Sequence, residues 1–73
     1  MKTRPRYYTL RRGHHNVRPW GELTIVGEVI HQAVPPYRWQ ARLPEGRYLP
    51  DARTTYTTRE EAAEALLKEA GYE

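Results

Sequence analysis

The sequence lacks cysteine and serine entirely, and these two absences exclude large classes of chemistry. No serine or cysteine nucleophile is available for acyl transfer, and neither disulfides nor thiolate metal sites can form. A domain of 73 residues without such cross-links must be held together by packing, by a partner or by self-association.

Large hydrophobic side chains are also scarce. There is no phenylalanine, and leucine, valine and isoleucine together make up 12 of the 73 residues. Two tryptophans and six tyrosines compensate in part, because aromatic rings bury large areas, and the net charge is only +3. We therefore expect one folded domain over residues 1–73, with a thin core rich in aromatic rings. Apolar runs are short, so we expect no membrane span and no signal peptide, and a cytoplasmic location.

The remaining composition argues against catalysis and indicates the kind of organism from which the sequence comes. The five glycines are scattered, which excludes a phosphate-cradling glycine-rich loop. A thin core leaves little room for a concave site, so we predict that the protein is not an enzyme and has no cofactor and no small-molecule substrate. Ten arginines against two lysines, and eight glutamates against one aspartate, are typical of a GC-rich or thermophilic source.

Charge is distributed unevenly along the chain. Residues 1–21 carry +6 with no acidic side chain, residues 22–58 are neutral, and residues 59–73 carry −3. Such an asymmetry suggests a polyanionic partner at the basic end. Residues 1–19, interpreted as a basic N-terminal arm or an extra strand, contain all six basic side chains: Lys2, Arg4, Arg6, Arg11, Arg12 and Arg18.

The C-terminal segment predicts a helix. Thr58 and Glu61 have the spacing of a capping box, and Gly71 supplies a C-terminal stop. The small and aliphatic side chains fall within one arc of the helical wheel, and the acidic ones lie outside it. The face expected to pack against the domain consists of Ala62, Ala63, Leu66, Leu67 and Ala70.

Residues 37–43 predict a half-buried strand, because apolar and polar side chains alternate strictly. Trp39 and its apolar neighbours share one face, which we expect to meet the helix. The opposite face carries Arg38, Gln40 and Arg42.

The rest of the sheet is predicted from turn chemistry and β-propensity. A turn at 44–46 leads, through a loop at 48–53, to a return strand at 54–57. Residues 22–34 favour another strand, in which Gly27 interrupts the alternation by a bulge or by burial on both sides. We expect an α+β fold: a three-stranded antiparallel sheet, four-stranded if residues 7–10 add a strand, with the C-terminal helix on one face.

The adjacent His14 and His15 form the most metal-like cluster of the sequence. Neighbouring residues of an extended chain point to opposite sides, and no third ligand stands at chelating spacing. We therefore predict no metal site and interpret residues 13–16 as a loop or turn.

Two arginine-rich features are candidates for nucleic-acid contact. The N-terminal arm interleaves arginine with tyrosine, and guanidinium groups bind phosphates while aromatic rings stack on bases. The polar face of strand 37–43 is the second feature. For the arm, the plain alternatives are a solvated tail or a strand whose arginines pair with the acidic C-terminal end. For the strand, the plain alternative is a polar sheet surface facing water, and apolar Val26 and Ile30 suggest that the N-terminal segment or a protein partner covers that face. The candidate contacts are Arg4, Arg6, Arg11, Arg12, Arg38, Gln40, Arg42 and Arg47.

The order of these signals is similar to that of the arm-type DNA-binding domains at the N-termini of phage and transposon integrases. The similarity covers residues 37–70, about half of the chain, through the Trp39 strand, the turn Pro44-Glu-Gly46-Arg47 and the alanine-rich helix after Thr58. The resemblance implies a three-stranded sheet packed on a C-terminal helix, with a sheet face in the DNA major groove. The positions comparable to the groove-facing strand are Arg38, Gln40 and Arg42.

Two function classes follow from these patterns. The first is a small nucleic-acid-binding accessory or regulatory protein with DNA as its partner. The second is a protein-binding module of phage or mobile-element type, an inhibitor or adaptor that docks on a larger host protein complex, because arginine, tyrosine and tryptophan are the usual interface anchors. The basic end favours the first.

Overall fold

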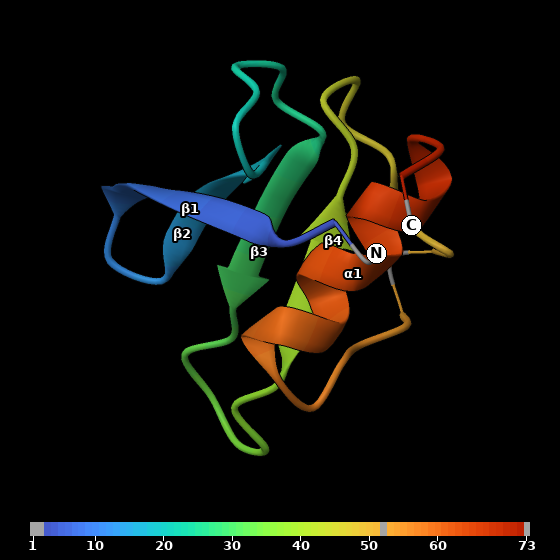
Figure 1. The fold of residues 1–73 in the computed structure, drawn as a ribbon. Coiled ribbons are helices and arrows are strands. Elements are labelled where there is room, and N and C mark those ends of the chain that lie inside the picture. The colour runs from blue at the N-terminus through green and yellow to red at the C-terminus, as the bar shows by residue number, and fades with distance from the viewer. Residues whose placement is uncertain (1–2, 52, 73) are drawn as a thin grey trace.

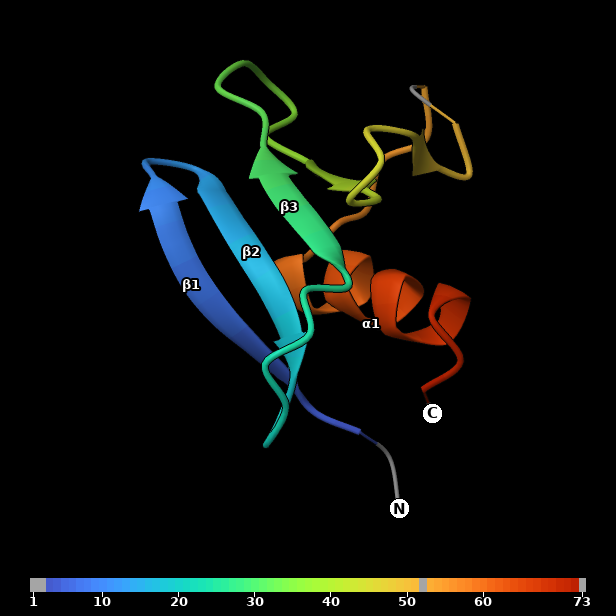
Figure 2. The same ribbon diagram turned by 90° about the horizontal axis from the view of Figure 1, so that it is seen from above.

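The computed structural model describes residues 3–51 and 53–72, and within them the chain forms five strands and one helix. The elements are β1 (Pro5–Arg11), β2 (His14–Pro19), β3 (Gly27–His31), β4 (Trp39–Arg42), β5 (Tyr48–Leu49) and α1 (Arg59–Glu69). The strands make one antiparallel sheet in chain order, and α1 lies across one face of it (Figures 1 and 2). The predicted α+β class is confirmed, but the sheet has more strands than the three or four expected.

The additional strands come from the basic N-terminal residues. Residues 5–19 form the β1–β2 hairpin, whose turn contains Gly13 with a φ of 76°. The expected loop at 13–16 is wrong, because β2 begins at His14 and its backbone pairs with β1 on one side and β3 on the other. The hairpin extends away from α1 in both views (Figures 1 and 2).

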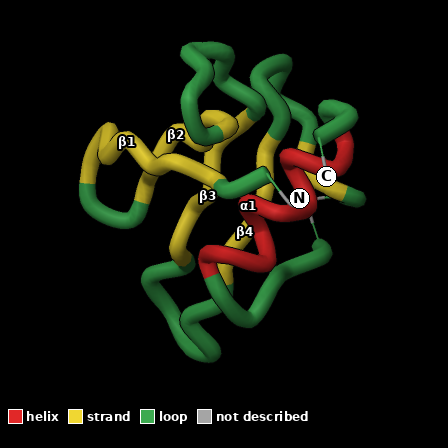
Figure 3. Tube along the Cα trace, in the orientation of Figure 1, coloured by secondary structure: helices red, strands yellow, loops and turns green. Residues whose placement is uncertain are grey.

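The C-terminal part of the sheet also differs from the expectation. Tyr48–Leu49 is a strand paired with β4, whereas residues 54–57 contribute only an isolated bridge between Tyr56 and Trp39. The Asp51 carboxylate accepts hydrogen bonds from the backbone N–H groups of Arg53 at 2.8 Å and of Thr54 at 3.0 Å. These bonds coil the chain into a turn that a continuous strand could not make. Figure 3 shows the long loops that join the short strands.

The core lies between the sheet and α1. Val17, Val29 and Ala41 are fully buried on the sheet side. From the helix, four of the five predicted residues are buried, namely Ala62, Ala63, Leu66 and Leu67, whereas Ala70 is exposed because it is the C-cap. The small alanine side chains let the helix backbone approach the sheet closely.

Both ends of the helix have the capping residues that the sequence predicts. The Thr58 hydroxyl accepts the Glu61 N–H at 3.2 Å, which confirms the predicted N-cap. At the other end Gly71 adopts a φ of 92°, and the N–H groups of Gly71 and Tyr72 bond the carbonyls of Lys68 and Leu67 in a Schellman motif. Within residues 3–51 and 53–72 no helix has the length and apolar character of a membrane span.

At Gly27 the helix packs closely against the sheet. A Cβ atom there would lie 2.5 Å from Leu66 Cδ2 and 2.5 Å from the Arg42 carbonyl oxygen, and the glycine has a φ of 155°. The interruption of the alternation therefore reflects close packing. Val26 is buried in the same core as Leu66, so its burial requires no cover over the other face of the sheet.

Candidate nucleic-acid interface

The side chains of the sheet divide into a face covered by α1 and an open face on the opposite side. Residues directly opposite in the register share a face, so Tyr8, Asn16, Glu28, Arg42 and Tyr48 form one row across all five strands. By the same alternation, the open face consists of Arg6, Tyr8, His14, Asn16, Arg18, Glu28, Ile30, Gln40, Arg42 and Tyr48.

The most ordered feature of the open face is a row of alternating arginines and aromatic rings, here called the Arg–aromatic ladder: Trp20, Arg6, Tyr8 and Arg18. Arg6 Cζ lies 5.4 Å from the Trp20 ring centroid and 5.3 Å from that of Tyr8, and Arg18 Cζ lies 4.2 Å from that of Tyr8. Such cation–π contacts are worth about 0.5–2 kcal/mol each. They keep the two guanidinium groups beside the rings.

The hairpin register builds this ladder. Arg6 and Tyr8 lie two residues apart on β1, so they share a face, and Arg18 lies directly across from Arg6 on β2. Beyond the paired strands, the Trp20 N–H donates to the Arg4 carbonyl at 2.8 Å. This bond holds the Trp20 backbone beside β1, while its side chain stays 65% exposed.

Charge on the hairpin is uncompensated. Arg47 and Arg42 have carboxylate partners elsewhere in the fold. Across residues 3–51 and 53–72, by contrast, no ion pair joins a carboxylate to Arg4 or to any of the four hairpin arginines: Arg6, Arg11, Arg12 and Arg18. Since residues 3–21 contain no acid, the hairpin is a concentrated source of positive potential.

The middle of the open face is electrically balanced. Arg42 Nη2 donates to Glu28 Oε1 at 2.7 Å, and His14 Nδ1 lies 3.8 Å from the other carboxylate oxygen. Beside this pair is a depression of about 300 Å³ lined by Leu10, Asn16, Ile25, Gly27, Glu28, Arg42, Leu43 and Pro44. Polar groups from the sheet and apolar side chains from β1 and the loops thus meet in one concavity.

The predicted contact residues do not all gather at one place. Arg6, Gln40 and Arg42 are on the open face, and Arg11 and Arg12 stand at the hairpin turn. Arg38 is just outside β4, and its guanidinium donates to the Thr55 hydroxyl at 2.7 Å and to the Thr55 carbonyl at 3.2 Å.

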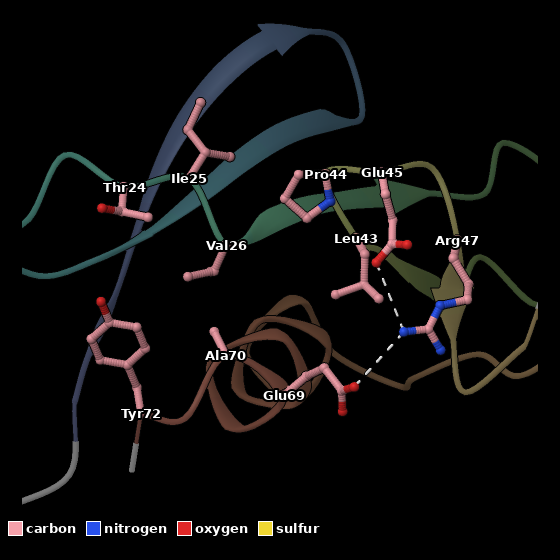
Figure 4. A pocket seen from close by; sticks show the side chains of 10 residues that line it. All are labelled: Thr24, Ile25, Val26, Leu43, Pro44, Glu45, Arg47, Glu69, Ala70 and Tyr72. Carbon is pink, nitrogen blue, oxygen red and sulfur yellow. Dashed lines mark ion pairs between the residues drawn. The ribbon is translucent and has the colours of Figure 1, made fainter.

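Arg47 lies on the helix side of the fold, in a groove of about 380 Å³ between the C-terminal end of α1 and the loops (Figure 4). Its guanidinium is 3.8 Å from Glu45 and 3.9 Å from Glu69, which joins the two walls of the groove. At the other end, the Tyr72 hydroxyl donates to Glu22 at 2.8 Å, and this bond raises the pKa of Tyr72. These ion pairs place Arg47 beside the C-terminal end of α1 and away from the open face.

The covered face carries a separate row of histidines and aromatic rings near the N-terminal end of α1. His31 stacks on Trp39 with ring centroids 4.5 Å apart, and the His15 ring centroid lies 5.9 Å from that of Trp39. Burial, together with the positive charge of Arg59, lowers the pKa of His15. His14 and His15 point to opposite faces of the sheet, and in the described part of the chain no group of three or more His, Asp or Glu side chains could hold a metal ion.

Sequence reasoning missed the role of Arg18 and Trp20 in the ladder. Both are visible as an arginine and a tryptophan in the basic segment, but their position beside Arg6 and Tyr8 follows from the hairpin register. A hairpin signal at Arg12-Gly13, flanked by β-compatible residues, is the feature that could have located them.

Comparison with protein-family models, with curated proteins and with solved structures gives no match.

Proposed function

We propose that this chain is a small nucleic-acid-binding protein of accessory or regulatory type that uses the open face and the β1–β2 hairpin. The observation that carries the proposal is the set of five arginines in residues 3–21 with no carboxylate partner in the described residues, two of which lie over aromatic rings. Arginine groups arranged in this way match phosphate oxygens in charge and in geometry.

The placement of the acidic residues supports the same assignment. The negative side chains of α1 lie on its outer surface, away from the sheet, so they repel a polyanion from the helix side only. The carboxylate of the open face, Glu28, is 12% exposed and already bonded to Arg42. A phosphate chain that approaches the hairpin therefore meets positive charge with little local repulsion.

Binding should show the salt dependence of phosphate contacts. The apparent affinity for fluorescein-labelled DNA, measured by anisotropy at roughly 50 and 200 mM salt, should fall steeply because each neutralised phosphate releases counterions. The double variant Arg6→Gln/Arg18→Gln should bind more weakly and reduce the slope of log affinity against log salt by about two, one for each lost contact.

The matched control removes the same charge from elsewhere. Arg53→Gln/Lys68→Gln also lowers the net charge by two, but these side chains belong to a loop and to α1. This control should keep the parent salt slope. Equal slopes for the two double variants, or no binding by the parent protein at the lower salt concentration, would refute the proposal.

A docking protein is the second candidate, because loop 20–26 exposes Trp20, Leu23 and Ile25 close together in sequence. Exposed aromatic and aliphatic side chains of this kind are typical anchors of protein interfaces. A pull-down from nuclease-treated lysate separates the two functions. A protein partner that survives nuclease and is lost in Leu23→Asp would favour this candidate over nucleic-acid binding.

A further inference from the structure

Trp20 offers a largely exposed aromatic face at the end of the ladder. Its side chain is 65% exposed, and one cation–π contact joins it to Arg6. The backbone bond to Arg4 fixes where the residue sits, so the indole is held beside β1. An exposed, anchored ring of this kind stacks well on a base whose own face is free, and the bases inside a duplex have no free face.

The ladder arginines are better placed for a flat ligand than for a groove. Arg6 and Arg18 lie over aromatic rings, with Cζ 4.2–5.4 Å from the ring centroids, which keeps the guanidinium groups beside those rings. Reading base edges in a major groove requires side chains that extend from the surface into a channel several ångströms deep. Extension would give up the cation–π contacts, whereas a phosphate or a base plane laid on the sheet can use the groups where they are.

A second, independent observation is the depression of about 300 Å³ on the open face. Asn16 lies directly across from Tyr8 and belongs to the same row as Glu28 and Arg42, so the ladder leads into the depression. Its volume is at the lower end of the range for small-ligand sites. Leu10 and Ile25 provide apolar contact and the polar side chains provide hydrogen-bonding groups, a combination that suits an unpaired base and that a paired base cannot reach.

We propose that the open face binds single-stranded nucleic acid in preference to a duplex, with one base stacked on Trp20, phosphates on Arg6 and Arg18, and a following base in the depression beside Asn16. This assignment rests on the proposed nucleic-acid function and specifies its substrate class. The strand would run along the length of β1 and β2, from Trp20 past Arg6 and Arg18 to Asn16, because Trp20, Arg18 and Asn16 are alternate residues of one segment.

The test compares one labelled oligonucleotide of about 12 residues as a single strand and annealed to its complement, with the intact 73-residue protein. The single strand should bind at least about fivefold more tightly, the equivalent of one stacked base. Trp20→Leu, which keeps charge and apolar bulk, should weaken single-strand binding by about 5- to 100-fold and weaken duplex binding much less, because the duplex loses only the support that Trp20 gives to Arg6. Trp20→Tyr, which keeps an aromatic ring, should restore most of the affinity.

The outcomes separate this inference from the function on which it rests. Salt-dependent binding in which the duplex is preferred, or in which Trp20→Leu affects both polymers equally, would overturn the single-strand assignment and leave nucleic-acid binding intact. Absence of binding to either polymer would overturn both. Far-UV circular dichroism of the two variants should match the parent spectrum, because the Trp20 side chain is mostly outside the core.

Discussion

Replacing Gly27 by alanine tests how closely α1 packs on the sheet. This packing covers one face of the sheet and leaves the opposite face open. The new methyl group would lie 2.5 Å from both Leu66 Cδ2 and the Arg42 carbonyl oxygen. Forcing an extra carbon into a packed core costs about 1–3 kcal/mol, and an alanine at this positive φ costs about 1–3 kcal/mol more. Against a total stability of about 4–11 kcal/mol for a domain of this size, Gly27→Ala should be marginally folded.

Gly21→Ala provides the matched control for the backbone part of this cost. Gly21 also has a positive φ, 83°, but a Cβ added there would meet no atom within 4 Å. Gly21→Ala should therefore lower the free energy of unfolding only by its backbone strain, about 1–2 kcal/mol. Urea denaturation followed by circular dichroism should give a much lower midpoint for Gly27→Ala than for Gly21→Ala. If the two midpoints fall equally, the close approach of Leu66 to the sheet is not the reason for glycine at position 27.

Three further predictions concern the helix cap, a histidine and Arg38. Thr58→Ala should lower the free energy of unfolding by about 1 kcal/mol in urea titrations, and Thr58→Asp should not. Because burial and Arg59 lower the pKa of His15 from its ordinary 6.5, the unfolded chain takes up this proton more readily, so stability should fall as the pH drops below 6.5; an NMR-titrated pKa at or above that value would contradict this. Arg38→Gln should destabilise the fold by about 1–2 kcal/mol through loss of its bonds to Thr55, and a drop in nucleic-acid affinity without a drop in stability would reassign Arg38 to the interface.

The parts of the fold that the sequence predicts well are those determined by neighbours in the chain. The capping box from Thr58 to Glu61 and the stop at Gly71 act within one helical turn, so their residue types suffice. The two-residue β5 is different, since Tyr48–Leu49 has no strand signature of its own and is ordered by pairing with β4. Residues 54–57 have the β-branched composition of a strand, but after the turn at Asp51 they form only an isolated bridge to Trp39.

The candidate interface likewise has a part that the sequence predicts and a part that depends on how the strands pair. Alternation alone predicts that Gln40 and Arg42 face away from the helix, and the register agrees. It cannot predict that Glu28 stands opposite Arg42, because that depends on which residues of two strands meet. The ladder likewise requires the register of β1 with β2, which brings Arg18 beside a tyrosine ten residues earlier in the chain. Composition thus reveals the charge excess, and pairing determines its arrangement.

The two-layer arrangement also makes an acidic helix compatible with the polyanionic ligand that we propose. The open face and the outer surface of α1 lie on opposite sides of a molecule that measures 34 × 23 × 23 Å. At physiological ionic strength the Debye length is about 8 Å, so charges on the helix are largely screened at the hairpin. At about 0.01 M salt the screening length grows to about 30 Å and exceeds the thickness of the molecule. We therefore expect the helix to repel a polyanion from a distance on its own side, so that the charge separation orients the proposed encounter while the arginine contacts determine affinity.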